Sequence, residues 1–151
     1  MIIRLATPAD IPTLTQLRYQ LRSKTVADVE SKQQFLDRCS EWMARSLKQL
    51  NWRCWVVEQD QTIFATLWLQ LIEKIPNPTR EPELLGYITN VFVAESQRAQ
   101  GIGSQLLTTA INFCKQEPVQ AVILWPTEKS HSLYERHGFV AREDSLELTL
   151  F

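Results

Sequence analysis

The sequence predicts an α/β fold in which a mixed β-sheet carries helices on both of its faces. Three observations lead to this prediction. Segments rich in β-branched and aromatic residues recur along the 151-residue chain, as is typical of strands. Other segments repeat apolar residues every three or four positions, as helices with one buried face do. In the second half, a strand, a glycine-containing loop, a helix and another strand follow one another, which predicts a right-handed β-α-β crossover.

The first half of the chain predicts one strand, two helices and a β-hairpin. Thr7 and Pro8 suit the start of a helix, whose apolar stripe runs to Leu21. A polar turn at 59–61 separates two strand-like segments. The expected elements are a strand at 2–5, a helix from Pro8 to Leu21, a longer helix at 29–50, and strands at 52–58 and 62–72.

The second half predicts the crossover and a C-terminal helix with flanking strands. The segment 119–125 is almost wholly apolar, so we expect it at the centre of the sheet. Gly138 should end the last helix. The expected elements are a strand at 84–93, a helix from 102 to about 115, a strand at 119–125, a helix at 127–137, and edge strands at 139–142 and 146–151. The order is therefore β-α-α-β-β-β-α-β-α-β, in a single domain spanning residues 1–151.

Composition limits the classes of function. The formal net charge of −1 predicts no general attraction to nucleic acid or to an anionic membrane. We expect no membrane span, because no apolar run approaches about 18 residues. The start of the chain does not read as a signal peptide, and the three cysteines form no CxxC pair. These features predict a cytoplasmic protein with reduced thiols.

The segment from Tyr87 to Ser104 carries the clearest functional pattern. A strand leads into a loop containing Gly101 and Gly103, and a one-sided helix follows. The first N–H groups of a helix lack intrahelical acceptors and lie at the positive end of its dipole. Such a loop and helix start suit a phosphate or a pyrophosphate. A dinucleotide-binding motif fits less well, because Leu106 stands where that motif needs its third glycine.

Two segments resemble a known family. The run Arg98-Ala99-Gln100-Gly101-Ile102-Gly103 is similar to the [Gln/Arg]-x-x-Gly-x-[Gly/Ala] signature of the GNAT superfamily of acyl-CoA-dependent N-acetyltransferases. Downstream, Leu133-Tyr134-Glu135-Arg136-His137-Gly138-Phe139 resembles the family's Leu-Tyr-x-x-x-Gly-Phe segment. The resemblance implies the GNAT-like acyl-CoA N-acyltransferase fold, with acetyl-CoA as co-substrate and a primary amine as acceptor.

The resemblance also implies roles for single residues. Main-chain groups near Val91 and Val93 would pair with the pantetheine arm, on a strand that bulges near Asn90 and diverges from its neighbour. The amides from Arg98 to Ser104 would hold the pyrophosphate, and the Ser104 hydroxyl would add a donor. The Tyr134 hydroxyl would meet the sulfur of CoA. The implied cofactor-binding residues are Val91, Phe92, Val93, Arg98, Ala99, Gln100, Gly101, Ile102, Gly103, Ser104, Thr127 and Tyr134.

These positions predict direct transfer without an acyl-enzyme. A primary amine attacks the thioester, a strand N–H near Val91 stabilises the oxyanion, and Tyr134 protonates the leaving thiolate as the catalytic residue. The base stays open, because the strand 84–93 contains no carboxylate and Tyr87 stands at or next to the position where many relatives carry glutamate. The proton could pass to Glu83 through water, to solvent, or to the main chain.

The class of activity and the acceptor also stay open. A non-catalytic acyl-CoA-binding or regulatory module would keep the same cofactor slot, and transfer of a longer acyl group would use the same chemistry. The acceptor is a small-molecule or peptide amine, and the resemblance places its site near Tyr19 and residues 22–28. We expect no metal, because His131 and His137 have no ligand partners at suitable spacing. The chain is expected to be a monomer or a homodimer, since the apolar segment 146–151 suits pairing with either its own sheet or a second chain.

Overall fold

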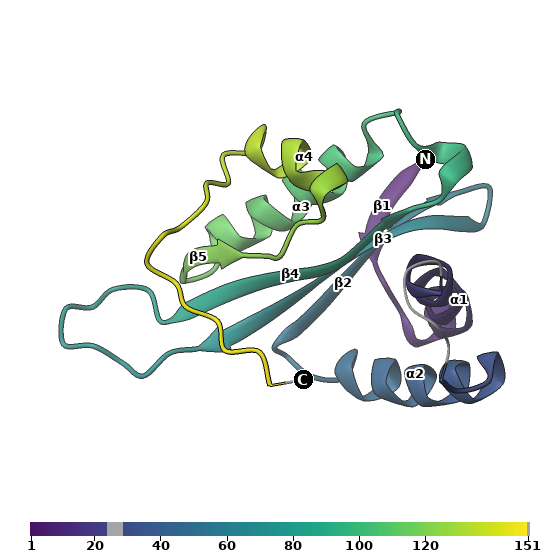
Figure 1. The fold of residues 1–151 in the computed structure, drawn as a ribbon, viewed down its shortest axis with the longest axis horizontal. Helices are drawn as coiled ribbons and strands as arrows, with labels where there is room; N and C mark the ends of the chain where they lie inside the picture. The colour runs from purple at the N-terminus through teal and green to yellow at the C-terminus, as the bar shows by residue number, and fades with distance from the viewer. Residues whose placement is uncertain (24–28, 151) are drawn as a thin grey trace.

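The computed structural model describes residues 1–23 and 29–150, which fold into three layers. A twisted sheet forms the middle layer, α1 and α2 cover one of its faces, and α3 and α4 cover the other (Figure 1). The predicted mixed sheet with helices on both faces is confirmed. Among the described helices, none is long and apolar enough to cross a membrane.

The elements follow the expected order as far as the last helix. The strands are β1 (Ile2–Leu5), β2 (Trp52–Gln59), β3 (Thr62–Glu73), β4 (Leu84–Val93) and β5 (Val119–Ile123). The helices are α1 (Ile11–Arg22), α2 (Lys32–Ser46), α3 (Ile102–Gln116) and α4 (His131–Glu135). Short 3₁₀ turns stand at Pro8–Asp10, Glu95–Gln97 and Glu128–Ser130.

The sheet has the strand order β1-β2-β3-β4-β5. Its first four strands run antiparallel to their neighbours, whereas β4 and β5 are parallel. The parallel pair is joined through α3, as the predicted β-α-β unit requires. Because parallel neighbours place their carboxyl ends at the same edge, the ends of β4 and β5 lie on the side where α3 begins.

Side chains alternate between two apolar clusters across the sheet. Leu67, Leu69 and Ile88 pack with the buried face of α3. Trp68 and Val56 point the other way and pack with Leu14 of α1 and Met43 of α2. Side chains alternate between the two faces along β3, and paired residues of neighbouring strands share a face. Ile88 of β4 therefore faces α3 like its partner Leu69, and Thr89 faces α1 and α2 like its partner Trp68.

Three sequence predictions are wrong in detail. The second helix is shorter than 29–50, because Ser31 caps it by accepting from the Gln34 N–H at 3.2 Å, and a turn follows Ser46. β5 lies at the end of the strand order and not at its centre, and it stops at Ile123 before the predicted end. An almost wholly apolar strand therefore did not indicate burial on both faces.

The predicted edge strands at 139–142 and 146–151 are also wrong, since residues 139–150 form no strand and residue 151 lies outside the described residues. The alternation that suggested them is real, but a strand also needs a partner to which its backbone can bond. Leu146, Leu148 and Leu150 are each more than four-fifths exposed, so neither face of the segment is buried. The side chain of Glu147 accepts a hydrogen bond from Trp125 Nε1 at 3.3 Å.

An ion-pair network joins β1, β2 and the start of α1. Arg4 Nη1 lies 2.8 Å from Asp10 Oδ2, and Arg4 Nη2 lies 2.6 Å from Glu58 Oε2. Asp10 Oδ2 also accepts from the Thr7 N–H at 2.7 Å, which caps the helix start. The hydrogen bond from Arg4 is the main reason that the pKa of Asp10 falls from 3.8 to about 2.

This network predicts a pH-dependent contribution to stability. A carboxyl whose pKa is lower in the folded state stabilises the fold above its unfolded pKa, and the contribution disappears as the pH falls through the folded value. Asp10→Asn should therefore lower the free energy of unfolding by about 1–2 kcal/mol at pH 7. The difference from wild type should shrink between pH 4 and pH 2, as urea denaturation would show.

Asp144→Asn is the matched control, because Asp144 pairs with Arg142 in an exposed segment. Exposed pairs contribute little to stability, so this variant should unfold like wild type throughout. Equal effects of the two substitutions would contradict a structural role for the Arg4–Asp10 pair.

Candidate active site

The second half of β4 contains one extra residue relative to β3. Thr66 of β3 pairs with Phe92 and Trp68 pairs with Thr89, so one residue of β3 stands opposite two residues of β4. Asn90 adopts the left-handed conformation with a φ of 52°. These features define a β-bulge, which bends the strand and redirects the side chains beyond it. The expected bulge near Asn90 is therefore confirmed.

β4 and β5 diverge before this bulge. Their pairing begins at Leu84 and Val119 and ends at Tyr87 and Ile123. Beyond that point, residues 88–93 pair with β3 alone among the described strands. The edge of β4 that faces away from β3 thus offers main-chain N–H and C=O groups to a third, extended partner. The Tyr87 ring stands where the strands part and contacts Trp125 edge to face, with ring centroids 5.1 Å apart.

The loop after β4 is held in a conformation with two left-handed residues. Ala99 has a φ of 61° and Gly101 a φ of 73°. Arg98 ties the loop to the strand, because its Nε donates to the Val93 carbonyl at 3.0 Å. Left-handed residues set into such a turn point successive N–H groups toward one side, which is a favourable geometry for an anion.

The start of α3 completes this anion-binding geometry. The Gln105 N–H makes the first helical bond, to the Gly101 carbonyl at 3.0 Å. The N–H groups of Ile102, Gly103 and Ser104 therefore have no intrahelical acceptor and lie at the positive end of a helix of 15 residues. A Cβ at position 103 would lie 3.5 Å from Leu133 Cδ2, so the helix start packs directly against α4.

A hydrogen-bonded pair links α3 to the end of α4. His137 Nδ1 lies 2.9 Å from the Leu133 carbonyl, which can only accept, so this nitrogen carries the proton. His137 Nε2 then accepts from the Ser104 hydroxyl, also at 2.9 Å. The predicted phosphate donor Ser104 thus has its hydroxyl engaged, while its N–H points out of the helix start. No local pattern in the sequence indicates this pair, because 33 positions separate its members.

Tyr134 is buried against the cluster beneath α3 and is 8% exposed. Its ring contacts Phe139 edge to face at 5.8 Å, after Gly138 reverses the chain with a φ of 87°. Burial raises the pKa of Tyr134, and a hydrogen bond with the Ser130 side chain opposes this in part. The phenol is therefore protonated at neutral pH and available as a donor.

Thr127 lies in the cap before α4. Its N–H donates to Ser130 Oγ at 2.9 Å, and its hydroxyl stands at the same distance from that oxygen. The side chain thus fixes the start of the last helical segment. Contact between Thr127 and a cofactor stays a prediction.

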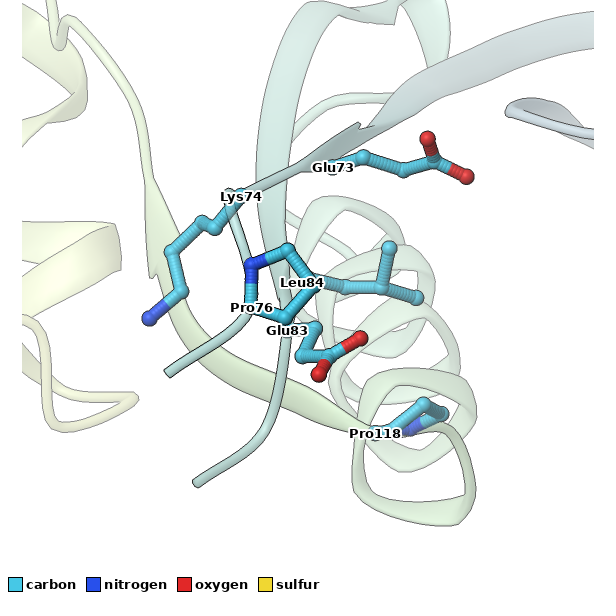
Figure 2. A pocket seen from close by; sticks show the side chains of 6 residues that line it. All are labelled: Glu73, Lys74, Pro76, Glu83, Leu84 and Pro118. Atoms are coloured by element: carbon cyan, nitrogen blue, oxygen red, sulfur yellow. The ribbon is translucent and has the colours of Figure 1, made fainter. Parts of the chain in front are cut away.

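Glu83 lies too far away to serve as a base. It borders a pocket of about 330 Å³ at the start of β4, together with Glu73, Lys74, Pro76, Leu84 and Pro118 (Figure 2). At roughly 3.3 Å per residue along β4, Glu83 stands about 25 Å from Val91. One water molecule cannot bridge that distance, so the hypothesis of Glu83 as base is wrong.

On the face of β4 opposite α3, an arginine reaches the bulge. Arg18 of α1 is half-buried, and its Nη1 lies 3.3 Å from Asn90 Oδ1. Sequence reasoning missed this residue, because 72 positions separate it from its partner and the helical repeat marks only apolar side chains. Tyr19, the neighbouring residue expected near the acceptor, packs against Phe35 at 5.7 Å. Of the expected acceptor segment, residues 24–28 lie outside the described residues.

The sequence profile of the acetyltransferase (GNAT) family matches residues 19–139. A glucosamine 6-phosphate N-acetyltransferase of Trypanosoma brucei brucei is 35% identical over 75 residues, which are 50% of this chain and 51% of that protein. The match thus spans about half the length of this relative.

Solved structures share the fold over almost the whole chain. A predicted acetyltransferase from Clostridium acetobutylicum, crystallised with acetyl-CoA, superimposes with a TM-score of 0.84 at 23% identity, over 99% of this chain and 96% of that one. A Trypanosoma brucei acetyltransferase gives a TM-score of 0.71 at 26% identity, with 99% of both chains covered.

Proposed function

Because this chain belongs to the acetyltransferase (GNAT) family, we propose that it moves an acetyl group from acetyl-CoA directly to a primary amine of a small-molecule or peptide acceptor. The observation that carries the proposal is that β4 and β5 stop pairing at Tyr87 and Ile123; we call this divergence, which leads toward the N-terminus of α3, the slot. One end of this slot suits a pyrophosphate and the other exposes the edge of a strand. Acetyl-CoA has both an anionic group and an extended amide-containing arm.

The anionic half of acetyl-CoA would bind to the loop and helix start. The N–H groups of Ile102, Gly103 and Ser104 supply donors, and Gly101 gives the loop its left-handed turn without strain. Arg98 is half-exposed beside them and adds positive charge. The remaining loop residues, Ala99 and Gln100, contribute their main chain. The pantetheine amides would extend the sheet along the free edge of Val91, Phe92 and Val93.

The chain then supplies two hydrogen-bond donors to the reaction. The amine nitrogen attacks the thioester carbonyl, and the Val91 N–H stabilises the negative oxygen that forms. As the intermediate collapses, its nitrogen loses a proton to water, the C–S bond breaks and the Tyr134 hydroxyl protonates the departing thiolate. The buried, protonated phenol of Tyr134 suits this role. Tyr134 is then reprotonated from solvent.

The proton of the amine leaves without a carboxylate on β4. No Asp or Glu stands in the sequence of this strand, and Glu83 lies at its far end. We propose that the acceptor loses its proton to water before attack. Glucosamine 6-phosphate is the first acceptor to test, because the relative from Trypanosoma brucei brucei is a glucosamine 6-phosphate N-acetyltransferase.

The second candidate function is a module that binds acyl-CoA without transferring it. The absence of a carboxylate from β4 is the observation that favours it. Release of free CoA thiol in the presence of an amine distinguishes the two, because a module that only binds releases none.

The first prediction from the proposed function concerns the glycine loop. Gly101→Glu and Gly101→Gln have the same size and the same unfavourable positive φ, but only the first adds a negative charge beside the pyrophosphate. Calorimetric titration with acetyl-CoA should give at least a tenfold weaker affinity for Gly101→Glu than for Gly101→Gln. Equal affinities would place the pyrophosphate elsewhere.

The second prediction concerns the phenol. Tyr134→Phe keeps the ring in its cluster and removes the proton donor. The turnover number should fall about 100-fold while the dissociation constant of acetyl-CoA changes less than threefold. Thermal unfolding of the variant, measured alongside, checks that the loss of the Ser130 contact leaves the fold intact. An unchanged turnover number would remove Tyr134 from the mechanism.

The third prediction concerns pH. If the acceptor is deprotonated in solution, kcat/KM should rise about tenfold per pH unit between pH 6.5 and 8.5 for an amine with a pKa near 10. A plateau that begins near pH 7, independent of which amine is used, would instead reveal a base supplied by the protein.

A further inference from the structure

Arg18 is the one half-buried arginine of the described residues whose contacts include neither a carboxylate nor a main-chain carbonyl. It lies between α1 and the bulge of β4, where its Nη1 donates to Asn90 Oδ1 at 3.3 Å. A guanidinium has five N–H donors, so this single long contact leaves most of them available. Among the described residues, the charge of Arg22 repels it.

Arg4 is a partly buried arginine with a structural role, and it differs from Arg18 because carboxylates neutralise its charge. Two carboxylates, Asp10 and Glu58, lie within 2.8 Å of its guanidinium. Their presence raises the pKa of Arg4, whereas burial and the charge of Arg22 lower the pKa of Arg18. A desolvated cation without a counter-charge is destabilising, and no carboxylate of the described residues supplies one, so a bound anion would stabilise Arg18.

Arg18 contacts the residue next to the main-chain group that would take part in the reaction. Its partner Asn90 directly precedes Val91, whose N–H would face the thioester oxygen, and consecutive Cα atoms lie about 3.8 Å apart. The side chain approaches β4 from the face covered by α1 and α2, because Thr89 pairs with Trp68 and Trp68 belongs to that cluster. Cys39 of α2 and Tyr87 of β4 also act on it electrostatically.

We infer that Arg18 binds an oxyanion carried by the acceptor itself, so that the substrate is a small primary amine bearing a carboxylate or a phosphate. This inference rests on the proposed acetyl transfer and specifies its acceptor. A guanidinium recognises either group through two parallel hydrogen bonds. The bulge fixes Asn90, and Asn90 holds the guanidinium in place. An anion bound there would hold its amine at the same bulge that positions the Val91 N–H.

The same geometry disfavours polycationic acceptors. Arg18 and Arg22 stand one helical turn apart on α1 and act on each other electrostatically. A polyamine or a lysine-rich peptide would bring further positive charge to this face, where no carboxylate offsets Arg18 in the described structure. The sequence alone does not distinguish polycationic acceptors from anionic amines, whereas the position of Arg18 favours the anionic amines.

The test compares amines that differ only in the anion. Glucosamine and glucosamine 6-phosphate form the phosphate pair, and propylamine and β-alanine form the carboxylate pair. Free-thiol release with acetyl-CoA should give a KM at least tenfold lower for the anionic member of at least one pair. Which pair shows the difference identifies the oxyanion.

Arg18→Gln should raise the KM of the preferred anionic amine about 10- to 100-fold and change its kcat and the kinetics of the neutral partner less than threefold. Arg18→Lys should restore part of the affinity, because the charge remains and the fork is lost. Arg45→Gln is the matched control, since Arg45 is exposed on α2 and loses the same charge. It should behave as wild type with every amine.

Two results separate this inference from the proposed function. If the wild type acetylates neutral and anionic amines equally well, or if Arg18→Gln weakens both members of a pair equally, the oxyanion site is refuted while acetyl transfer stands. If no amine is acetylated, calorimetric titration of the protein saturated with CoA decides. Binding of an anionic amine that Arg18→Gln abolishes supports the site without transfer, and its absence refutes both.

Discussion

The function proposed for this chain depends on a single extra residue in β4. Asn90 takes a left-handed φ of 52°, and the pairing with β3 shifts around it. Since β5 stops pairing at Tyr87, three residues before the bulge, the second half of β4 has one free edge. In a regular sheet, β5 would continue beside β4 and form hydrogen bonds with these N–H and C=O groups. The slot is therefore a consequence of where the strands stop matching, and not of a cavity closed by side chains.

The walls of the slot are held in place by contacts between distant segments. The start of α3 packs on Leu133, and Ser104 donates to His137 at 2.9 Å, so the loop that suits a pyrophosphate is held against α4. Because Tyr134 lies between these two contacts along the chain, the same packing places the phenol. On the other face, Arg18 meets the bulge from α1. The bulge thus lies between the cofactor side and the acceptor side of the sheet.

Much of this arrangement could be predicted from local sequence. The β-branched composition of 84–93, the glycines at 101 and 103 and the apolar repeat of α3 predict the strand, loop and helix, because backbone preference and one-sided burial are local properties. The contacts Ser104–His137 and Arg18–Asn90 could not be predicted, since they join residues far apart in the chain. The C-terminal leucines show the converse limit. Their alternation satisfies the pattern of a strand, yet residues 146–150 have no strand partner within the described chain.

Amide hydrogen exchange with and without acetyl-CoA is the sharpest test of cofactor binding in the slot, because it reads the N–H groups themselves. If acetyl-CoA fills the slot, exchange should slow at residues 91–93 along the free edge of β4 and at residues 98–104, including the three unpaired N–H groups of α3. The start of β4 near Glu83 should exchange as before, since it lies at the far end of the strand. Unchanged exchange at 98–104 with saturating acetyl-CoA would contradict a pyrophosphate site at the start of α3.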